Sequence, residues 1–241
     1  MDDLGRLGPI EAVSLDFTGT LAHVPRLGAI YAEALQRHGA AADPGQLARL
    51  FREAWDELEC RVVLGQDRFR HHPGGAEGFW GSLLARILER LGAEPPSPFL
   101  AAELFDRFRR ADAWKLWPDV VPALEELHER GIHVGIVSNF DHRLPGIVRD
   151  LGLEPLVETV VTSWEVEAEK PHPLPFDTLR RRLQVHPRRL VHVGNDRRRD
   201  VEGAVAAGQR ALWLSRDGDE GADLSSLAEL GDRLRDLETT W

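Results

Sequence analysis

The chain has 241 residues, of which 42% are hydrophobic and 29% charged, and this composition excludes a disordered protein and allows a sizeable core. Its formal net charge of −10 argues against general binding to nucleic acid or anionic membranes, because both require a basic surface. The single cysteine, Cys60, excludes an intrachain disulfide and a multi-cysteine zinc site.

No targeting or membrane segment is recognisable in the sequence. Residues 1–9 lack the basic region and the apolar core of a signal peptide. No apolar run approaches the roughly 20 residues that would cross a bilayer. With the single cysteine, these features predict a cytoplasmic protein without membrane partners, and we expect a monomer or a homodimer.

The first element is a short apolar run, 12–15, bounded by Pro9 and Gly19, which predicts a central parallel strand buried on both faces. Asp16 follows at the end of this strand, where Gly19 lets the backbone turn sharply. Such an Asp is more often a turn former or a helix cap. A catalytic role for Asp16 therefore needs support from later segments.

The next segment, from about Leu27 to Asp112, carries apolar residues at helical spacing and has no pattern typical of a strand. The expected helices are 30–38, 43–58, 79–91 and 97–108. Asp43 and Ser97 are suitable N-cap residues. The pattern predicts an all-helical domain, 22–114, inserted into a core domain formed by residues 1–21 and 115–241.

From residue 115 onward, strand patterns alternate with helical patterns. Strands are expected at 133–137, 157–162, 190–193 and 210–214. Helices are expected at 120–130, 144–151, 175–183 and 201–207. Repeated strand–helix units imply right-handed crossovers, and they predict an α/β fold with a doubly wound, Rossmann-like parallel sheet.

The unusual polar residues of the core all follow predicted strands, where an open parallel sheet binds its ligands. They are Asp16, Ser138, Asn139, Lys170, Asn195, Asp196 and Asp200. A carboxylate nucleophile beside a lysine and a serine hydroxyl suits group transfer through a covalent aspartyl intermediate. This convergence supports Asp16 as the nucleophile.

The charge on a phosphoryl group would repel Asp16 unless a lysine and a metal neutralised it. Mg²⁺ prefers oxygen ligands. The candidate ligands are Asp16, the backbone carbonyl of Thr18, Asn195, and Asp196 or Asp200. The candidate phosphate-binding residues are Thr20, Ser138, Asn139 and Lys170, because hydroxyls and the amides of a helix start can hold phosphate oxygens.

Four segments in order resemble the four motifs of the haloacid dehalogenase superfamily of hydrolases. They are Asp16-Phe-Thr-Gly-Thr20, Ser138-Asn139, Lys170-Pro171, and Gly194-Asn195-Asp196 with Asp200. The resemblance covers nearly the whole chain and is closest to phosphatase-like members, with residues 22–114 as the family's cap. It implies that Asp16 is the nucleophile, that Ser138 binds the transferred group, that Lys170 neutralises the intermediate and that the last segment holds metal.

Two residues depart from the phosphatase pattern of that family. Thr18 stands where these phosphatases usually carry a second Asp, and its hydroxyl cannot act as a general acid at neutral pH. General acid–base help is worth about 10² to 10⁴-fold in rate, so we expect a slow phosphatase of small phosphorylated molecules. Asn195 replaces a metal-binding Asp and should weaken Mg²⁺ binding, for which Asp196 could compensate.

Neither departure decides the function. Cation-pumping ATPases of the superfamily carry Thr at the position of Thr18 and still form an aspartyl phosphate. Its dehalogenases need no metal and tend to have Asn at the position of Asn195, but their preceding serine pair is replaced here by Val193-Gly194. A metal-independent dehalogenase and a catalytically inactive binding protein therefore remain as alternatives.

Other residues allow a functional and a structural interpretation. His23 could replace the missing acid, although an exposed loop histidine is the more ordinary interpretation. His71 and His72 lie on a loop that we expect to face the pocket and touch substrate. Further residues are interpreted structurally: Trp55, Trp80 and Trp114 as core of the helical domain, Arg197, Arg198 and Arg199 as a solvated face, and Ser163 and Trp164 as supports for Lys170.

Overall fold

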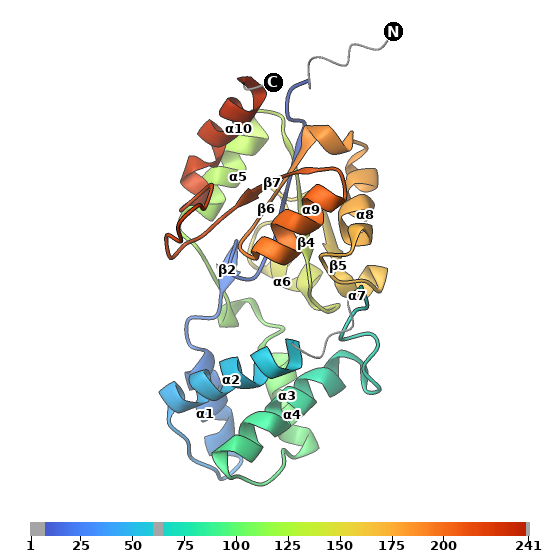
Figure 1. The fold of residues 1–241 in the computed structure, drawn as a ribbon. Coiled ribbons are helices and arrows are strands. Elements are labelled where there is room, and N and C mark those ends of the chain that lie inside the picture. The colour runs from blue at the N-terminus through green and yellow to red at the C-terminus, as the bar shows by residue number, and fades with distance from the viewer. Residues whose placement is uncertain (1–7, 60–64, 240–241) are drawn as a thin grey trace.

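The computed structural model describes residues 8–59 and 65–239, so Cys60 lies outside the described residues. Its centre is a parallel sheet of β1 (Ala12–Leu15), β4 (His133–Ser138), β5 (Thr159–Thr162), β6 (Leu190–Gly194) and β7 (Arg210–Trp213) in the order β5-β4-β1-β6-β7. The predicted α/β fold is confirmed (Figure 1). Because β1 lies between β4 and β6, Asp16 emerges at the middle of the carboxyl edge, where ligands bind in such sheets.

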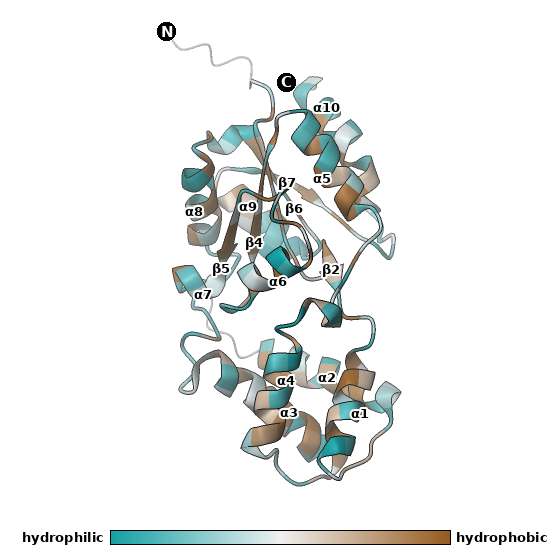
Figure 2. Cartoon of the chain, turned by 180° about the vertical axis from the view of Figure 1, so that it is seen from behind, coloured by the Kyte–Doolittle hydropathy of each residue, from teal (hydrophilic) through white to brown (hydrophobic). Residues whose placement is uncertain are grey.

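Helices cover both faces of this sheet. They are α5 (Val120–Glu129), α6 (Leu144–Asp150), α8 (Pro173–Leu183), α9 (Gly203–Ala206) and α10 (Leu230–Thr239). Val13 and Leu15 belong to the core beneath α5, α6 and α10, whereas Ala12 packs with α8 and α9. Successive residues therefore face opposite sides, as the two-residue period of a strand requires. Figure 2 shows the resulting apolar strands inside polar outer helix surfaces.

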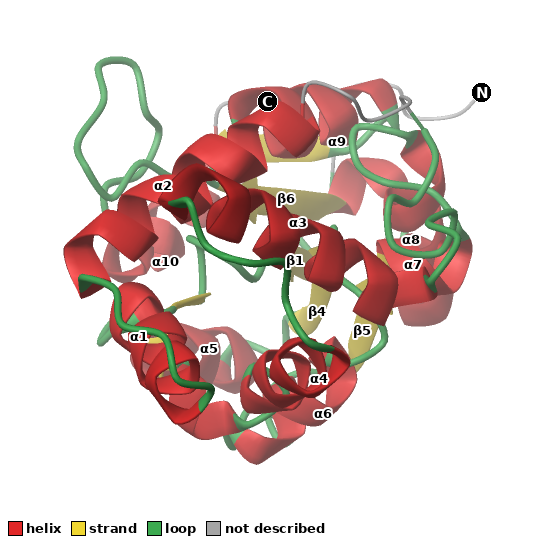
Figure 3. Ribbon diagram, turned by 90° about the horizontal axis from the view of Figure 1, so that it is seen from below, coloured by secondary structure: helices red, strands yellow, loops and turns green. Residues whose placement is uncertain are grey.

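The four expected helices of the inserted segment are present. They are α1 (Leu27–Arg37), α2 (Pro44–Glu59), α3 (Gly75–Leu91) and α4 (Pro98–Arg107). They pack around an apolar cluster of their own that includes Leu47, Leu83 and Ile87, and they lie beyond the carboxyl edge of the sheet (Figures 1 and 3). No strand occurs in the described residues between 27 and 112. The exact division at residues 21/22 and 114/115 stays a prediction.

The chain passes between the two parts at an antiparallel pair of two-residue strands, β2 (Ala22–His23) and β3 (Lys115–Leu116). This pair is absent from the sequence prediction, because two residues cannot establish a strand period. The strand expected from residue 157 begins at Thr159. The remaining short elements are η1 (Ala111–Ala113), α7 (Ser163–Val166), η2 (Pro187–Arg189), the π-helical η3 (Arg197–Glu202) and η4 (Leu227–Glu229). Among the described helices none has both the length and the apolar character needed to span a membrane.

Candidate active site

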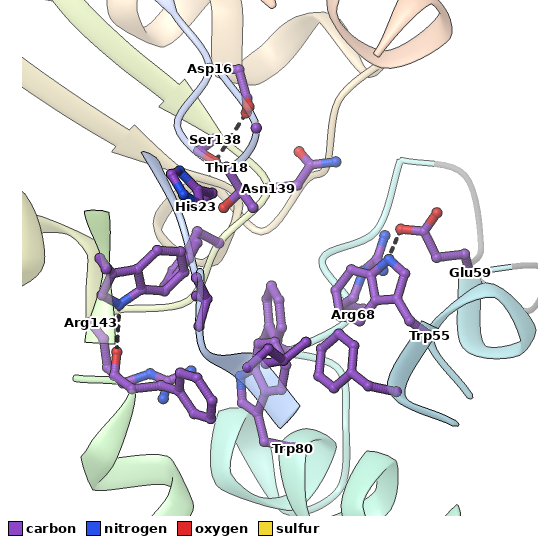
Figure 4. Close-up of a pocket in the computed structure, with 18 of the residues that line it drawn as sticks. Asp16, Thr18, His23, Trp55, Glu59, Arg68, Trp80, Ser138, Asn139 and Arg143 are labelled. Atoms are coloured by element: carbon purple, nitrogen blue, oxygen red, sulfur yellow. Dashed lines mark hydrogen bonds and ion pairs between the residues drawn. The ribbon is translucent and has the colours of Figure 1, made fainter. Parts of the chain in front are cut away.

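Lys170 joins two carboxylates at the carboxyl edge of the sheet. Its Nζ atom donates hydrogen bonds to Oδ1 of Asp16 at 2.8 Å, to Oδ1 of Asp200 at 2.6 Å and to the backbone carbonyl of Val137 at 2.8 Å. The Ser138 hydroxyl donates to the same Oδ1 of Asp16 at 3.1 Å (Figure 4). Residues from four predicted segments are thus brought into contact, and all of these side chains are buried.

Asn139 holds the backbone of Lys170 in place. Its Nδ2 donates to the Lys170 carbonyl at 3.0 Å, and its Oδ1 accepts from the Lys170 amide at 2.7 Å. Both polar atoms of this side chain are therefore engaged by the loop that carries the lysine. This contact supports a positioning contribution that sequence spacing could not reveal.

The segment after β6 uses its carboxylates for internal contacts. Asp196 Oδ1 accepts from the amides of Arg198 and Arg199 at 3.0 and 2.8 Å, which caps η3. Asp200 Oδ2 accepts from the Asp196 amide at 2.9 Å. The more exposed Asn195 accepts a hydrogen bond from the Thr20 hydroxyl at 3.1 Å. Thr20 and Asn195 thus support each other beside the nucleophile candidate.

Burial and charge shift the titration of this centre in opposite directions. Burial raises the pKa of Asp16 above its ordinary value, although Lys170 opposes the shift. Burial alone would lower the pKa of Lys170, but Asp16 and Asp200 raise it, which keeps the ammonium charged. Burial would likewise raise the pKa of Asp200, but Lys170 and His192 hold it well below its ordinary value.

His192 extends this network into the core under the sheet edge. Its Nε2 lies 3.3 Å from Oδ1 of Asp200, and its Nδ1 lies 2.8 Å from the Ser14 hydroxyl. Burial lowers the pKa of His192, so the ring is neutral near pH 7. Ser14 and His192 face the same side of adjacent strands, and the sequence analysis did not single them out.

Oxygen atoms at the sheet edge are the groups that could hold Mg²⁺. No group of three His, Cys, Asp or Glu side chains in residues 8–59 and 65–239 could hold a metal. However, only two hydrogen bonds from the described residues reach the Asp16 carboxylate, so it has capacity for a further partner, and the Asn195 amide lines the same cavity. Because Mg²⁺ often uses one or two carboxylates and keeps several waters, these residues fit a weakly held, hydrated ion.

The residues after Asp16 face a cavity of about 470 Å³. Thr18 is exposed at its wall, and His23 lines it from β2 (Figure 4). His23 is no exposed loop residue: its ring lies 4.2 Å from that of Trp117, and its Nδ1 is buried without a described hydrogen-bond partner. Burial, followed by the positive charge of Lys115 and Arg216, lowers the pKa of His23.

The far wall of the cavity comes from the helical segment. Trp55, Trp80 and Trp114 line it, so they are wall residues as well as partly buried members of the apolar clusters. The Trp80 indole N–H donates to Asp141 at 2.8 Å, across to the loop between β4 and α6. Arg143 of that loop pairs with Asp141 at 2.7 Å and donates to the Phe105 carbonyl at 2.8 Å. These contacts fix the wall against the sheet domain.

Two sequence interpretations of charged residues need correction. His71 and His72 are not among the described residues that line the cavity: His71 Nδ1 lies 2.9 Å from the Asp67 carbonyl, and His72 Nε2 lies 3.1 Å from the Ser82 hydroxyl. The same loop reaches the cavity through Arg68 instead. Arg199 is not simply solvated either, because it forms ion pairs with Asp196 at 3.1 Å and Glu59 at 2.9 Å.

Comparison with known proteins gives one consistent family. The model of haloacid dehalogenase-like hydrolases matches residues 10–208. The Danio rerio "Haloacid dehalogenase-like hydrolase domain-containing protein 3" is 29% identical over 211 residues, which cover 86% of each chain.

Two solved structures resemble the whole chain. A HAD phosphatase from Thermococcus onnurineus has 25% identity and a TM-score of 0.63, covering 93% of this chain and 97% of its own. A 2-haloacid dehalogenase from Pseudomonas syringae pv. Tomato DC3000 has 26% identity and a TM-score of 0.65, and the match covers 95% of this chain and 99% of the dehalogenase chain. Because the two similarities are nearly equal, overall resemblance does not separate the two reactions.

Proposed function

Because the chain belongs to the haloacid dehalogenase-like hydrolases, we propose that this hydrolase cleaves phosphate esters of small molecules through a covalent intermediate on Asp16. The observation that carries the proposal is the asymmetry of the Asp16 carboxylate. Oδ1 is held by Lys170 at 2.8 Å and by Ser138 at 3.1 Å, whereas Oδ2 has no hydrogen-bond partner in the described residues and belongs to a side chain that lines the cavity. One oxygen is thus oriented and the other is free to attack.

In the first proposed step, Oδ2 of Asp16 attacks phosphorus while the bond from phosphorus to the ester oxygen breaks. Lys170 and Ser138 hold the carboxylate in position and offset negative charge as it develops. The leaving oxygen takes its proton from water, because the Thr18 hydroxyl is no acid at neutral pH. In the second step water attacks phosphorus, which releases inorganic phosphate and restores the Asp16 carboxylate.

A bound Mg²⁺ would offset charge on the phosphoryl oxygens. We propose that the Thr18 carbonyl and Asn195 would hold it, with Asp16 contributing only the carboxylate oxygen that does not attack, and with little help from Asp196 and Asp200, whose carboxylates are engaged elsewhere. We also propose that α1 to α4 act as a cap over the site and that the single-cysteine protein works in the cytoplasm.

A dehalogenase is the second candidate. It is supported by Asn195 and by the similarity to the 2-haloacid dehalogenase. In that reaction Oδ2 of Asp16 would attack carbon and expel halide, and water would then release the hydroxy acid. The lysine between two carboxylates suits either reaction, so product analysis must decide.

The test measures phosphate release from para-nitrophenyl phosphate and, separately, halide release from 2-chloropropionate, each with Mg²⁺ and with chelator. We expect Mg²⁺-dependent phosphate release that disappears in Asp16→Asn. Asp177 is a half-exposed residue on α8, and the Asp177→Asn protein, purified in the same way, is the control for contaminating activity and should retain turnover. Halide release that needs no metal would support the second candidate, and no turnover by a folded protein in either assay would refute both.

A further inference from the structure

The wall of the cavity opposite Asp16 indicates what the substrate carries beyond its phosphate. Resting on the proposed function, we infer that the leaving group is an uncharged, apolar alcohol, aromatic or branched, and not a sugar or a hydroxy acid. Three features of the wall support this inference: its aromatic surface, the pairing of its charges and the occupation of two of its three indole hydrogens.

Aromatic side chains from separate segments meet on the wall. Trp55 and Trp80 stack with ring centroids 5.7 Å apart, and Phe69 stacks on Trp80 at 5.9 Å. The ring of Trp114 also lies 5.6 Å from that of Phe140. Pockets for small molecules are mostly apolar and hold a few hundred cubic ångströms, which the volume of about 470 Å³ matches. A surface of this kind gains most from burying apolar area of the ligand.

The cations of the wall are already neutralised. Arg68 pairs with Glu169 at 2.7 Å and with Glu59 at 3.2 Å. Arg143 pairs with Asp141, and Arg199 pairs with Asp196 and Glu59. Among the described residues that line the cavity, every arginine and lysine therefore has a carboxylate partner. A second anionic group on the substrate would find no free positive charge, and burying it would be costly.

Two of the three indole N–H groups of the wall are occupied as well. Trp80 donates to Asp141 at 2.8 Å, and Trp114 donates to the Phe108 carbonyl at 3.1 Å. A sugar would bring several hydroxyls into contact with aromatic faces and these two occupied donors, and the Trp55 indole and the Tyr31 hydroxyl of the lining are too few to satisfy them all. Each hydroxyl that lost water without gaining a partner would weaken binding. The wall thus discriminates against polyhydroxylated leaving groups.

The test compares kcat/KM for methyl, n-butyl and benzyl phosphate with that for glucose 6-phosphate. If each added methylene is buried, kcat/KM should rise about fourfold per CH₂, and the benzyl ester should exceed glucose 6-phosphate by about 100-fold or more. Equal or faster hydrolysis of the sugar phosphate overturns the inference but leaves the proposed function intact.

Binding provides a readout that does not depend on turnover. Calorimetry with the Asp16→Asn protein should give an affinity for benzylphosphonate about tenfold or more above that for methylphosphonate. Equal affinities would overturn the inference. Failure of the wild-type enzyme to release phosphate from any ester would overturn the proposed function instead.

A matched pair of variants locates the effect in the cavity. Ala101 on α4 lines the cavity, whereas its neighbour Ala102 is exposed and does not. Ala101→Phe should lower the benzyl-to-methyl ratio of kcat/KM about tenfold, because it fills the space for the leaving group. Ala102→Phe should leave the ratio unchanged. An unchanged ratio in a folded Ala101→Phe protein contradicts the assigned position of the leaving group.

Discussion

Arg68 binds Glu169 through two parallel hydrogen bonds, in which Nη2 and Nε of the guanidinium each lie 2.7 Å from a different oxygen of the carboxylate. Arg68 belongs to the loop before α3, and Glu169 immediately precedes Lys170. Both side chains are buried, with 5% and 2% of their surface exposed. The helical domain thus contacts the segment that carries the site lysine through a rigid, planar pair.

Glu169→Gln should therefore destabilise the folded protein. Removing one member of a buried pair typically costs about 3–5 kcal/mol, and Glu59, 3.2 Å from Arg68, should offset part of that cost. Urea unfolding measures the change. The neighbouring pair of Arg70 and Glu167 joins the same two segments at 3.3 Å but is 45% and 55% exposed, so Glu167→Gln should cost less than about 1 kcal/mol. Similar, small losses in both variants would show that the buried pair contributes little.

The sequence was sufficient to predict the parallel sheet and the residues that surround Asp16. Strand period, turn residues and the position of polar residues after each strand are local signals, and they correctly brought Asp16, Ser138 and Lys170 together. The contacts of Arg68 with Glu169 had no such signal, because 101 positions separate them and either residue is ordinary on a surface. Long-range pairing of charges depends on how the two domains pack.

The same limit applies to the cavity. Helical spacing correctly placed Trp80 in a helix, but period alone cannot tell a core face from a cavity wall. The unusual pair of His71 and His72 led us to expect that these two side chains face the cavity, yet Arg68 of the same loop lines it instead. Unusual residue types indicate that a loop can contribute to a functional site. Which of its side chains point into the cavity depends on the conformation of the loop backbone.

Thr18→Asp should increase phosphatase turnover. The Thr18 side chain lines the cavity two residues after Asp16, where a carboxyl group could protonate the leaving oxygen and later activate water. General acid–base help is worth about 10² to 10⁴-fold, so we expect kcat to rise within that range at saturating Mg²⁺. Thr18→Asn, similar in size but unable to transfer a proton, is the control. A folded Thr18→Asp protein without a gain would place the slow step elsewhere.

His23 should titrate below the ordinary histidine value of 6.5, because burial and two cations disfavour its charged form. Lys115, paired with it across β2 and β3, supplies part of that charge, so Lys115→Met should raise the pKa of His23. The shift is measured by NMR titration of the imidazole C–H signals, with the His133 signal as a reference in the same spectra.

The sign of the linked stability change follows from that shift. Below pH 6.5 the unfolded chain binds a proton at His23 more readily than the folded chain. The contribution of His23 to stability is therefore complete above pH 6.5 and is lost as the pH falls from this value through the lower pKa of the folded state. Lys115→Met should weaken this dependence in urea unfolding between pH 7.5 and 5.5. A stronger dependence would contradict the assigned direction.

Gly194→Ala should disrupt the contacts that join Asp16, Lys170 and Asp200. A β-carbon at Gly194 would lie 2.2 Å from the carboxyl carbon of Asp200, so the carboxylate that holds Lys170 would have to move. Overpacking of this kind costs about 1–3 kcal/mol, and loss of the Lys170 contact should lower kcat as well. Gly146→Ala in α6 is the matched control, since its β-carbon would meet only Arg149 at 3.9 Å. In the Gly146→Ala protein the free energy of unfolding should rise by about 0.5–1 kcal/mol, because alanine favours the helix more than glycine, and turnover should be unchanged. If Gly194→Ala kept full stability and activity, the tight packing of Asp200 against β6 would not be what positions Lys170.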